Sequence, residues 1–163
     1  RSVTVFDIVE ERLALAKRLG ADETIDTKDP DFMEKAKALT DGSGFDSVFE
    51  TAGNPITIRM GFELAANKAH FCCIGTPHRE MTFTPSLWEC MNRKEFTLTG
   101  SWMSYSSPFP GKEWELVAHY FATGQLKFDE ALIYRRFPLE KADEAFALYH
   151  DPAKVQGKVM FLL

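Results

Sequence analysis

The first residue whose type and place could do chemistry is Asp7, near the end of an apolar segment at residues 3–8. Such a segment is typical of a strand buried on both faces of a parallel sheet, and open sheets of this kind bind ligands outside the carboxyl ends of their strands. A carboxylate there can accept hydrogen bonds from both hydroxyls of an adenine ribose, and it repels a 2′-phosphate. The alternative is that Asp7 only caps the helix expected after it.

A basic residue, Arg12, follows five residues later in the first turns of a helix expected at residues 10–19. Its guanidinium could lie against the ribose or the adenine face, and the alternative is a solvated surface arginine. In dinucleotide-binding folds the acidic residue follows a glycine-rich turn by about 20 residues. Counting back from Asp7 passes Arg1, so we expect the chain to be part of a longer protein, with that turn upstream.

Three short turns made mainly of small residues are the next candidates. Each follows a segment that we predict to be a parallel strand, so all three should lie at the same edge of the sheet. Small residues there let a ligand approach the backbone, and three such turns together indicate a cofactor crevice. The turns are Thr51-Ala52-Gly53, Gly75-Thr76-Pro77 and Gly100-Ser101-Trp102.

Metal ligation and nucleophilic catalysis are poorly supported by the residue spacing. Cys72 and Cys73 are adjacent on an expected strand, so their side chains should point to opposite faces and cannot share one ion. Cys90 has no partner at zinc spacing, and the four histidines are scattered along the chain. We therefore expect no metal ligands within this chain, and no Ser-His-Asp or Cys-His arrangement in it supports nucleophilic catalysis.

The elements that must position these candidates alternate along the sequence. Strands are predicted at residues 3–8, 24–25, 45–50, 69–74 and 96–99. A capping residue followed by proline marks the start of three of the four intervening helices. Those pairs are Asp29-Pro30, Asn54-Pro55 and Thr84-Pro85, and the helix after the first should bury Phe32, Ala36 and Leu39. This alternation predicts a parallel sheet with helices on both faces.

The pattern changes after Gly100. Residues 101–111 are rich in proline, serine and aromatic residues, and the aromatic stretch at residues 102–109 could line a substrate or join two subunits. An amphipathic helix expected at residues 112–123 should bury Trp114, Val117, Ala118 and Phe121. The remaining expected elements are a strand at residues 132–135, a helix at 139–149 and a strand at 158–163.

Composition excludes several classes of protein. A length of 163 residues suits one ordinary domain, and 45% apolar with 13% aromatic residues excludes a disordered chain. The net charge of −5 argues against nucleic-acid binding, and no apolar run approaches the ~20 residues needed to cross a bilayer. An odd number of cysteines and no signal-peptide pattern favour a cytoplasmic protein.

Several segments together resemble the medium-chain, zinc-type alcohol and polyol dehydrogenases. VTVFDIVEERLALAKRLGADETIDT resembles their second Rossmann strand and following helix, FDSVFETAGNP their fourth strand and AHFCCIGTP their fifth. RRFPLEKADEAFALYHDPAKVQGKVMFLL resembles the stretch in which their chain returns to the catalytic domain. Within the family, GSWMSYSSPFPGKEWE is most similar to the galactitol-1-phosphate 5-dehydrogenases.

The resemblance implies an α/β fold with a partial Rossmann-type, doubly wound parallel sheet at residues 1–124. Residues 125–163 would belong with a GroES-like catalytic domain outside this chain. The zinc ligands, the first Rossmann strand and the glycine-rich turn would lie upstream of Arg1. NAD is the implied cofactor and zinc a cofactor of the longer protein only. The implied NAD-binding residues are Asp7 and Arg12 at the adenine ribose, and Thr51, Gly75, Thr76, Ser101 and Trp102 along the other ribose and the nicotinamide.

The implied activity is oxidation of a secondary alcohol to a ketone, on a polyol or polyol phosphate such as galactitol 1-phosphate. An alternative is another alcohol, threonine or sorbitol dehydrogenase of the same family. A second is a non-catalytic module that dimerises through the strand running from Phe96 to Thr99, a contact that would also make the dehydrogenase a homo-oligomer. A third is part of an S-adenosylmethionine-dependent methyltransferase, which an antiparallel C-terminal hairpin would favour.

The expected strand order leaves two segments short of neighbours. In the usual order of a Rossmann sheet, the first strand lies between the second and the fourth. We therefore expect the strand at residues 3–8 to lack a neighbour on one side. The strand at residues 158–163 should also lack one, because its family partner belongs to the catalytic domain.

Overall fold

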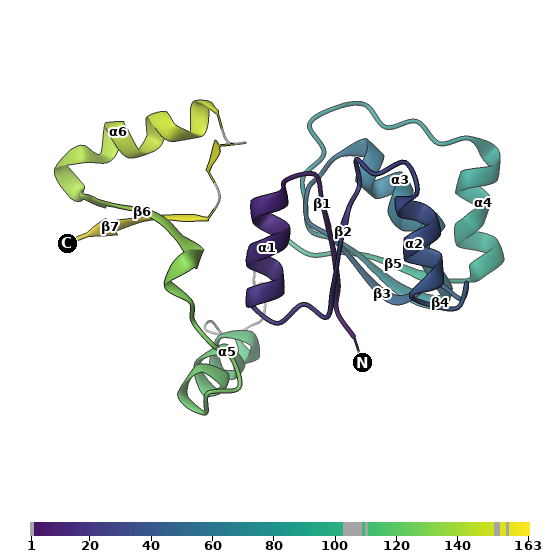
Figure 1. The fold of residues 1–163 in the computed structure, drawn as a ribbon, viewed down its shortest axis with the longest axis horizontal. Coiled ribbons are helices and arrows are strands. Elements are labelled where there is room, and N and C mark those ends of the chain that lie inside the picture. The colour runs from purple at the N-terminus through teal and green to yellow at the C-terminus, as the bar shows by residue number, and fades with distance from the viewer. Residues whose placement is uncertain (1, 103–108, 110, 152–153, 156) are drawn as a thin grey trace. The chain divides into compact units, whose positions relative to one another are not determined.

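A computed structural model describes residues 2–102, 109, 111–151, 154–155 and 157–163. The chain forms two compact units, one made of Arg1–Asp29 and Ser106–Leu163 and the other of Pro30–Tyr105. Figure 1 labels the helices and strands of both units. Most of the aromatic loop considered above, at residues 103–108 and 110, lies outside the described residues.

The N-terminal part of the first unit is a strand–helix–strand motif of β1 (Thr4–Asp7), α1 (Glu10–Arg18) and β2 (Glu23–Asp26). The two strands pair in parallel, from Thr4 opposite Glu23 to Asp7 opposite Asp26. Helix α1 has acidic residues in its first turn and basic residues in its last, which suits the helix dipole. Gly20 follows its end at a φ of +109°, as the sequence predicted for a glycine after a helix.

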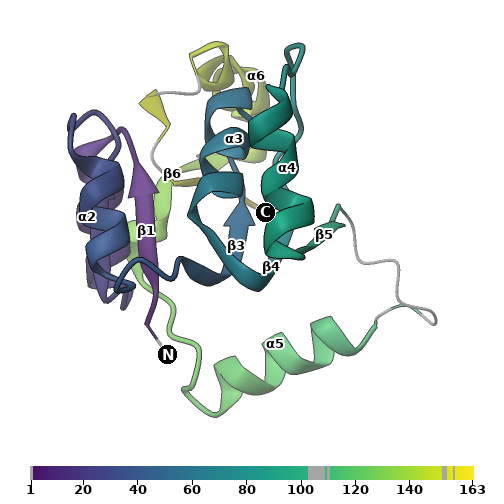
Figure 2. The ribbon, with the colours of Figure 1, turned by 90° about the vertical axis from the view of Figure 1, so that its right-hand side faces the viewer.

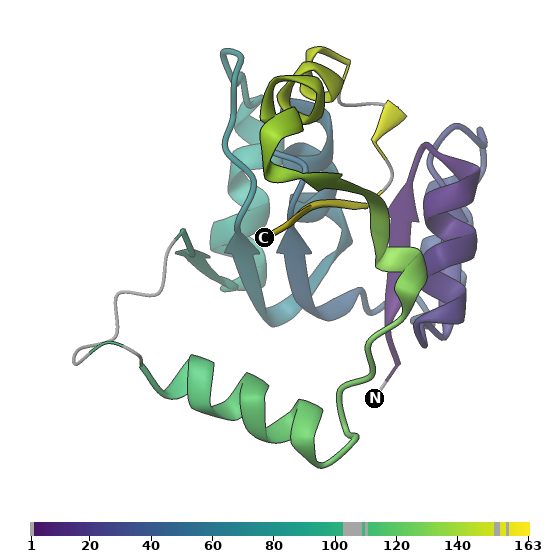
Figure 3. The same cartoon turned by 90° about the vertical axis from the view of Figure 1, so that its left-hand side faces the viewer.

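The second unit contains a three-stranded sheet in the order β3-β4-β5, with all strands parallel. Helices α3 and α4 lie side by side on one face of this sheet, as Figures 2 and 3 show from opposite sides. The six elements of the unit are α2 (Phe32–Ala38), β3 (Phe45–Glu50), α3 (Pro55–Leu64), β4 (Ala65–Cys73), α4 (Pro85–Lys94) and β5 (Thr97–Gly100).

The core of the second unit is aromatic and lies between the sheet and the helices α3 and α4. Phe62 of α3 and Phe71 of β4 are 1% and 0% exposed, and their ring centroids are 5.5 Å apart in an edge-on arrangement. Phe96 closes the cluster against both rings. Gly61 allows this close packing, because a Cβ there would run into the ring of Phe71. Proline at the first helical position and a side-chain cap start both helices: Asn54 accepts from the Ile56 amide and Thr84 from the Leu87 amide.

The C-terminal part of the first unit holds a second two-stranded parallel pair, β6 with β7. The last strand thus has a neighbour on one side, β6 through residues 133–138, while its other edge ends this two-stranded sheet of the described residues. The elements are α5 (Lys112–Ala122), η1 (Glu130–Leu132), β6 (Ile133–Pro138), η2 (Leu139–Lys141), α6 (Ala142–Ala147), η3 (Leu148–His150) and β7 (Lys158–Leu162).

Two helices differ from their predictions. The helix expected from Asp29-Pro30 begins at Phe32, because Asp26 first turns the chain, its carboxylate accepting from the Lys28 amide and its carbonyl from the Asp29 amide. Leu39, which was expected to point inward, is 46% exposed. Helix α5 has no buried residue, and three side chains of its apolar stripe are exposed instead: Trp114 at 54%, Val117 at 46% and Phe121 at 46%.

Some boundaries also shift. Strand β4 begins at Ala65, four residues earlier than predicted, with Lys68 at a φ of +61° where its register against β3 slips. The helix predicted at residues 139–149 is a short α-helix between two 3₁₀ turns. Every strand pairing is nevertheless parallel, which confirms the α/β class with parallel sheets. Within the described residues, no helix has the length and apolar character needed to cross a bilayer.

Candidate functional site

The carboxyl edge of the β3-β4-β5 sheet brings together the three turns predicted from the sequence. Glu50, Cys73 and Gly100 end their strands in register, Glu50 opposite Cys73 and Cys73 opposite Gly100. The Ile74 and Gly75 amides donate to the Glu50 carbonyl at 2.8 and 3.0 Å, and the Ser101 amide donates to the Cys73 carbonyl at 2.9 Å. The turns that follow β3, β4 and β5 thus begin at the same edge of the sheet. The residues brought there are Thr51, Gly75, Thr76, Ser101 and Trp102, of which all but the half-buried Gly75 are exposed.

Two of these turns touch each other through their backbones. Gly53 has a φ of +62°, and a Cβ there would overlap the Thr76 carbonyl. A Cβ at Gly75 would overlap the backbone amide nitrogen of Gly53. From the sequence, these glycines are expected to allow the close approach of a ligand, and the structure supplies another reason for them, namely the close approach of one turn to the next.

Glu50 holds this edge of the sheet in place, and it is not among the residues predicted from the sequence. Its side chain is buried, with the residue 5% exposed. Oε1 accepts from the Ala52 amide at 3.0 Å, the Gly53 amide at 3.0 Å and the Thr57 hydroxyl at 2.7 Å, and Oε2 accepts from the Gly53 amide at 3.1 Å. The signal that could have found it was present, because Glu50, like Asp7, is an acidic residue at the end of a strand.

Asp7 and Arg12 lie together in the first unit. Asp7 Oδ1 accepts from the Ile8 and Val9 amides at 2.7 and 2.9 Å, which turns the chain just before α1. Oδ2 lies 3.9 Å from Arg12 Nη1, with 25% of the Asp7 side chain and 37% of the Arg12 side chain exposed. Asp7 therefore has a structural role before the helix and still presents a second oxygen beside a cation at the carboxyl end of β1.

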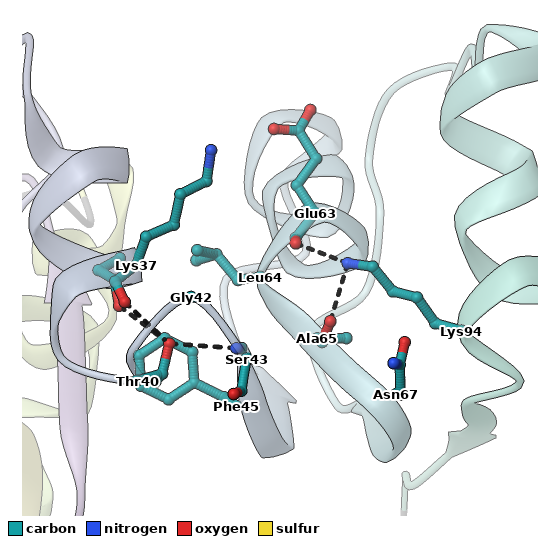
Figure 4. Close-up of a pocket in the computed structure, with 12 residues that line it drawn as sticks. Lys37, Thr40, Gly42, Ser43, Phe45, Glu63, Leu64, Ala65, Asn67 and Lys94 are labelled. Carbon is teal, nitrogen blue, oxygen red and sulfur yellow. Dashed lines mark hydrogen bonds between the residues drawn. The ribbon is translucent and has the colours of Figure 1, made fainter.

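A separate hollow of about 200 Å³ in the second unit lies at the opposite edge of the sheet, where β3 and β4 begin (Figure 4). Lys94 reaches into its wall and donates to the carbonyls of Phe62, Glu63 and Ala65 at 3.0, 2.7 and 2.8 Å. Burial lowers the pKa of Lys94, and the nearby Lys37 lowers it further, while Cys90 and Glu63 act in the opposite direction. Lys94 satisfies carbonyl groups at the C-terminal end of α3. We therefore interpret the hollow as the surroundings of a capped helix end and not as a cofactor site.

The described residues do not fit a zinc ion. They contain no group of three or more histidine, cysteine, aspartate or glutamate residues placed to hold a metal. Burial raises the pKa of the Cys73 thiol, with smaller contributions from the charge of Glu50 and from Cys72, so the thiolate that a metal needs is disfavoured there. Each unit by itself carries groups that suit part of a dinucleotide: a carboxylate beside an arginine at the carboxyl end of β1, and hydroxyl groups and small turns at the carboxyl edge of the β3-β4-β5 sheet.

Parallel strands joined by helices, with polar turns at their carboxyl ends, are the arrangement of the α/β domains that bind ligands, nucleotides among them, outside the carboxyl ends of their strands. A family model for zinc-binding dehydrogenases matches residues 2–119, more than half of the sequence. The chain belongs to the zinc-binding dehydrogenase family. The galactitol 1-phosphate 5-dehydrogenase of Escherichia coli strain K12 is 35% identical over 135 residues, which cover 83% of this chain and 39% of that protein.

Solved structures agree with this assignment. The crystal structure of galactitol-1-phosphate dehydrogenase from Escherichia coli matches 97% of this chain and 45% of its own, with a TM-score of 0.83 and 35% identity. An NAD-dependent alcohol dehydrogenase matches 99% of this chain and 44% of its own, with a TM-score of 0.77 and 25% identity. The chain thus spans roughly two fifths of the length of these relatives. The parallel β6–β7 pair also departs from the antiparallel C-terminal hairpin that would have favoured a methyltransferase.

Proposed function

We propose that this chain supplies most of the NAD-binding part of a longer, NAD- and zinc-dependent polyol-phosphate dehydrogenase. The observation that carries the proposal is the carboxyl edge of the second unit, where three turns from neighbouring strands emerge in register. Family membership and similarity to a galactitol 1-phosphate 5-dehydrogenase and an NAD-dependent alcohol dehydrogenase support it. In this proposal the Rossmann-type domain spans residues 1–124, and residues 125–163 belong with a catalytic domain outside this chain.

The binding residues act by hydrogen bonding and by charge. The Asp7 carboxylate accepts hydrogen bonds from the adenine ribose and repels a 2′-phosphate, while Arg12 lies beside it. Thr51, Thr76 and Ser101 offer hydroxyl groups to the second ribose and the nicotinamide, and Gly75 and Trp102 line the same path. When bound, NAD supplies an acceptor for a hydride from the alcohol carbon. Zinc belongs to the longer protein, and the described residues do not contribute its ligands.

The proposed substrate is a polyol phosphate of the galactitol 1-phosphate kind, whose secondary alcohol becomes a ketone. The phosphate-binding and zinc-binding residues would lie outside this chain. Another alcohol, threonine or sorbitol dehydrogenase of the same family is the alternative.

The test uses the full-length protein that contains this chain. Binding of NADH and NADPH is measured by nicotinamide fluorescence, and zinc-loaded enzyme is assayed with galactitol 1-phosphate, arabitol phosphate, sorbitol and threonine. We expect binding of NADH in preference to NADPH, and the highest kcat/KM with galactitol 1-phosphate. A protein that binds neither cofactor would contradict the cofactor assignment, and a preference for threonine or sorbitol would contradict only the substrate.

The proposal includes a cytoplasmic homo-oligomer that contacts neither nucleic acid nor membrane. Strand β5, with the preceding Phe96, ends the described β3-β4-β5 sheet, so its second edge is a place where a copy could pair. Replacing Leu98 with proline would remove a backbone donor from this strand. If β5 forms the contact, the variant should sediment as a monomer, and an unchanged oligomer would place the interface elsewhere.

A further inference from the structure

Glu50 is the single charged or polar residue that the described part of the chain buries. Burying a carboxylate costs free energy unless hydrogen bonds replace its water. Here two backbone amides and one hydroxyl, all of them neutral, supply four hydrogen bonds of 2.7 to 3.1 Å. Such a group is expected to specify one local conformation, because its partners lose their hydrogen bonds in any other.

The bonds of Glu50 reach both turns that touch at the edge of the sheet. Its carboxylate binds the amides of Ala52 and Gly53 and the Thr57 hydroxyl in the first full turn of α3. Its backbone carbonyl accepts from the Ile74 and Gly75 amides of the following turn. One residue therefore fixes the turn after β3 by its side chain and the turn after β4 by its backbone.

The backbone contact of Gly53 with Gly75 and Thr76 couples the positions of the two turns. Because Gly53 packs directly on the backbone of Thr76, a displacement of the first turn must displace the second. Thr51 and Thr76, which the proposed function assigns to NAD, lie in these two turns. A rigid turn lowers the entropy lost when a ligand binds, so a loosened turn should cost affinity even when every contact residue is still present.

We propose that Glu50 is a positioning residue of the NAD site, whose buried carboxylate holds the turns at Thr51 and at Gly75-Thr76 in the binding geometry before the cofactor arrives. The proposal rests on the proposed function, because it requires that these turns receive NAD. It assigns Glu50 no contact with the cofactor. Asp7 and its half of the nucleotide site do not depend on Glu50 in this proposal.

The test compares a whole dinucleotide with its adenosine half on the full-length protein. Glu50→Gln keeps the shape of the side chain but turns one acceptor into a donor that faces an amide. We expect the Kd for NADH to rise about tenfold, equivalent to about 1.4 kcal/mol or one charge-assisted hydrogen bond, while the Kd for AMP stays within twofold of wild type. Glu34→Gln, on the exposed part of α2, is the matched control and should change neither Kd.

A merely structural role predicts a different pattern. In one case Glu50→Gln would lower the melting temperature and weaken the binding of AMP and of NADH equally. In the other, the folded variant would bind both ligands with unchanged Kd values. Either result would overturn the proposal. If Glu50→Gln does not fold, the pair Thr57→Val and Thr57→Ser decides. Valine removes the 2.7 Å hydroxyl donor and serine retains it. We then expect the valine variant alone to weaken NADH binding several-fold, and equal NADH affinity in the two variants would refute the role. A wild-type protein that binds neither AMP nor NADH would instead contradict the proposed function.

Discussion

Three carboxylates, of Asp7, Asp26 and Glu50, end parallel strands among the described residues, and the surroundings of Asp7 and Glu50 give these two different uses. Asp7 accepts from the two amides that follow it with one oxygen and presents the other toward Arg12, with a quarter of its side chain exposed. Glu50 has both oxygens occupied by the adjacent turn and by Thr57, and it is 5% exposed. Asp7 can therefore accept a ligand hydroxyl, whereas Glu50 can act only through the residues that it holds.

The charge of Asp7 should set the choice between NAD and NADP. Asp7→Ser in the full-length protein removes the repulsion of a 2′-phosphate while keeping an acceptor for the Ile8 and Val9 amides. We expect the ratio of kcat/KM for NAD to that for NADP to fall by about tenfold or more, since like charges at a recognition site cost a few kcal/mol. Glu11→Gln, an exposed acidic residue in the first turn of α1, serves as the control. An unchanged ratio in Asp7→Ser would leave Asp7 as a turn residue only.

The contact between the turns makes a prediction about stability. Gly53→Ala places a side chain at a positive φ and against the Thr76 backbone, whereas Gly42→Ala faces the same φ penalty in open space. We expect Gly42→Ala to lower the free energy of unfolding by about 1 kcal/mol and Gly53→Ala by about 2–4 kcal/mol. Urea denaturation of both variants measures the difference. Equal losses would mean that the second turn moves away without cost.

At this scale the sequence predicts the position of the exposed candidate residues at the carboxyl ends of strands, but it does not single out the buried Glu50. Asp7 and the turns at Thr51, Gly75 and Ser101 follow from the rule that ligands bind at the carboxyl ends of parallel strands. Glu50 satisfies the same rule, but its role depends on Thr57, which a helix brings to the carboxylate from seven residues away. A contact of that kind follows from the fold and is not visible in the local pattern.

Among the elements, α3 depends on a side chain from α4. Lys94 donates to three carbonyls around the end of α3, of which two belong to the helix itself. Lys94→Met keeps the length of the side chain but leaves those carbonyls to water, so we expect a loss of about 1–2 kcal/mol in the free energy of unfolding. Lys127→Met, an exposed lysine outside any described helix or strand, is the control and should cost less than about 0.5 kcal/mol.

The difference in the free energy of unfolding between wild type and Lys94→Met should depend on pH, with a definite sign. Burial lowers the pKa of Lys94 below its ordinary 10.5, so the folded protein releases this proton at a lower pH than the unfolded chain. Between the lowered value and 10.5 the unfolded chain binds more protons, and the free energy of unfolding must rise with pH. Wild type should therefore gain stability relative to Lys94→Met as the pH approaches 10.5. A difference that shrinks over this window would show that the pKa is raised instead.

Element types were easier to predict than their burial and their ends. Caps followed by proline correctly placed the starts of α3 and α4, where Asn54 and Thr84 both make capping bonds. The same pattern failed at Asp29-Pro30, because the side chain of Asp26 commits the next residues to a turn. In α5 the apolar stripe is real but exposed, since a periodic pattern defines a face and does not specify the surface that covers it.

At the scale of the whole molecule, β1 and β3 each have one edge without a partner strand among the described residues. Strand β1 pairs with β2, and β3 pairs with β4, in separate sheets of the described residues. In the usual order of a Rossmann sheet, β1 would be the second strand and β3 the fourth, and the first strand would pair with both. The open edges of β1 and β3 leave backbone groups without a partner strand, and such edges recruit other strands. The 163-residue chain alone should therefore be marginally stable and bind NADH weakly or not at all.

Hydrogen exchange can test this expectation strand by strand. β4 is paired on both sides, by β3 and by β5, and serves as the internal reference. In the isolated chain we expect the amides of β1 and β3 to exchange at least about tenfold faster than those of β4, because each has one open edge. In the full-length protein, a strand inserted beside each of them should bring their protection close to that of β4.

Equal protection of β1, β3 and β4 in an isolated chain that sediments as a monomer would contradict this expectation, because β1 and β3 would then have found partners within these 163 residues. Equal protection in a dimer would mean that a second copy supplies the strand.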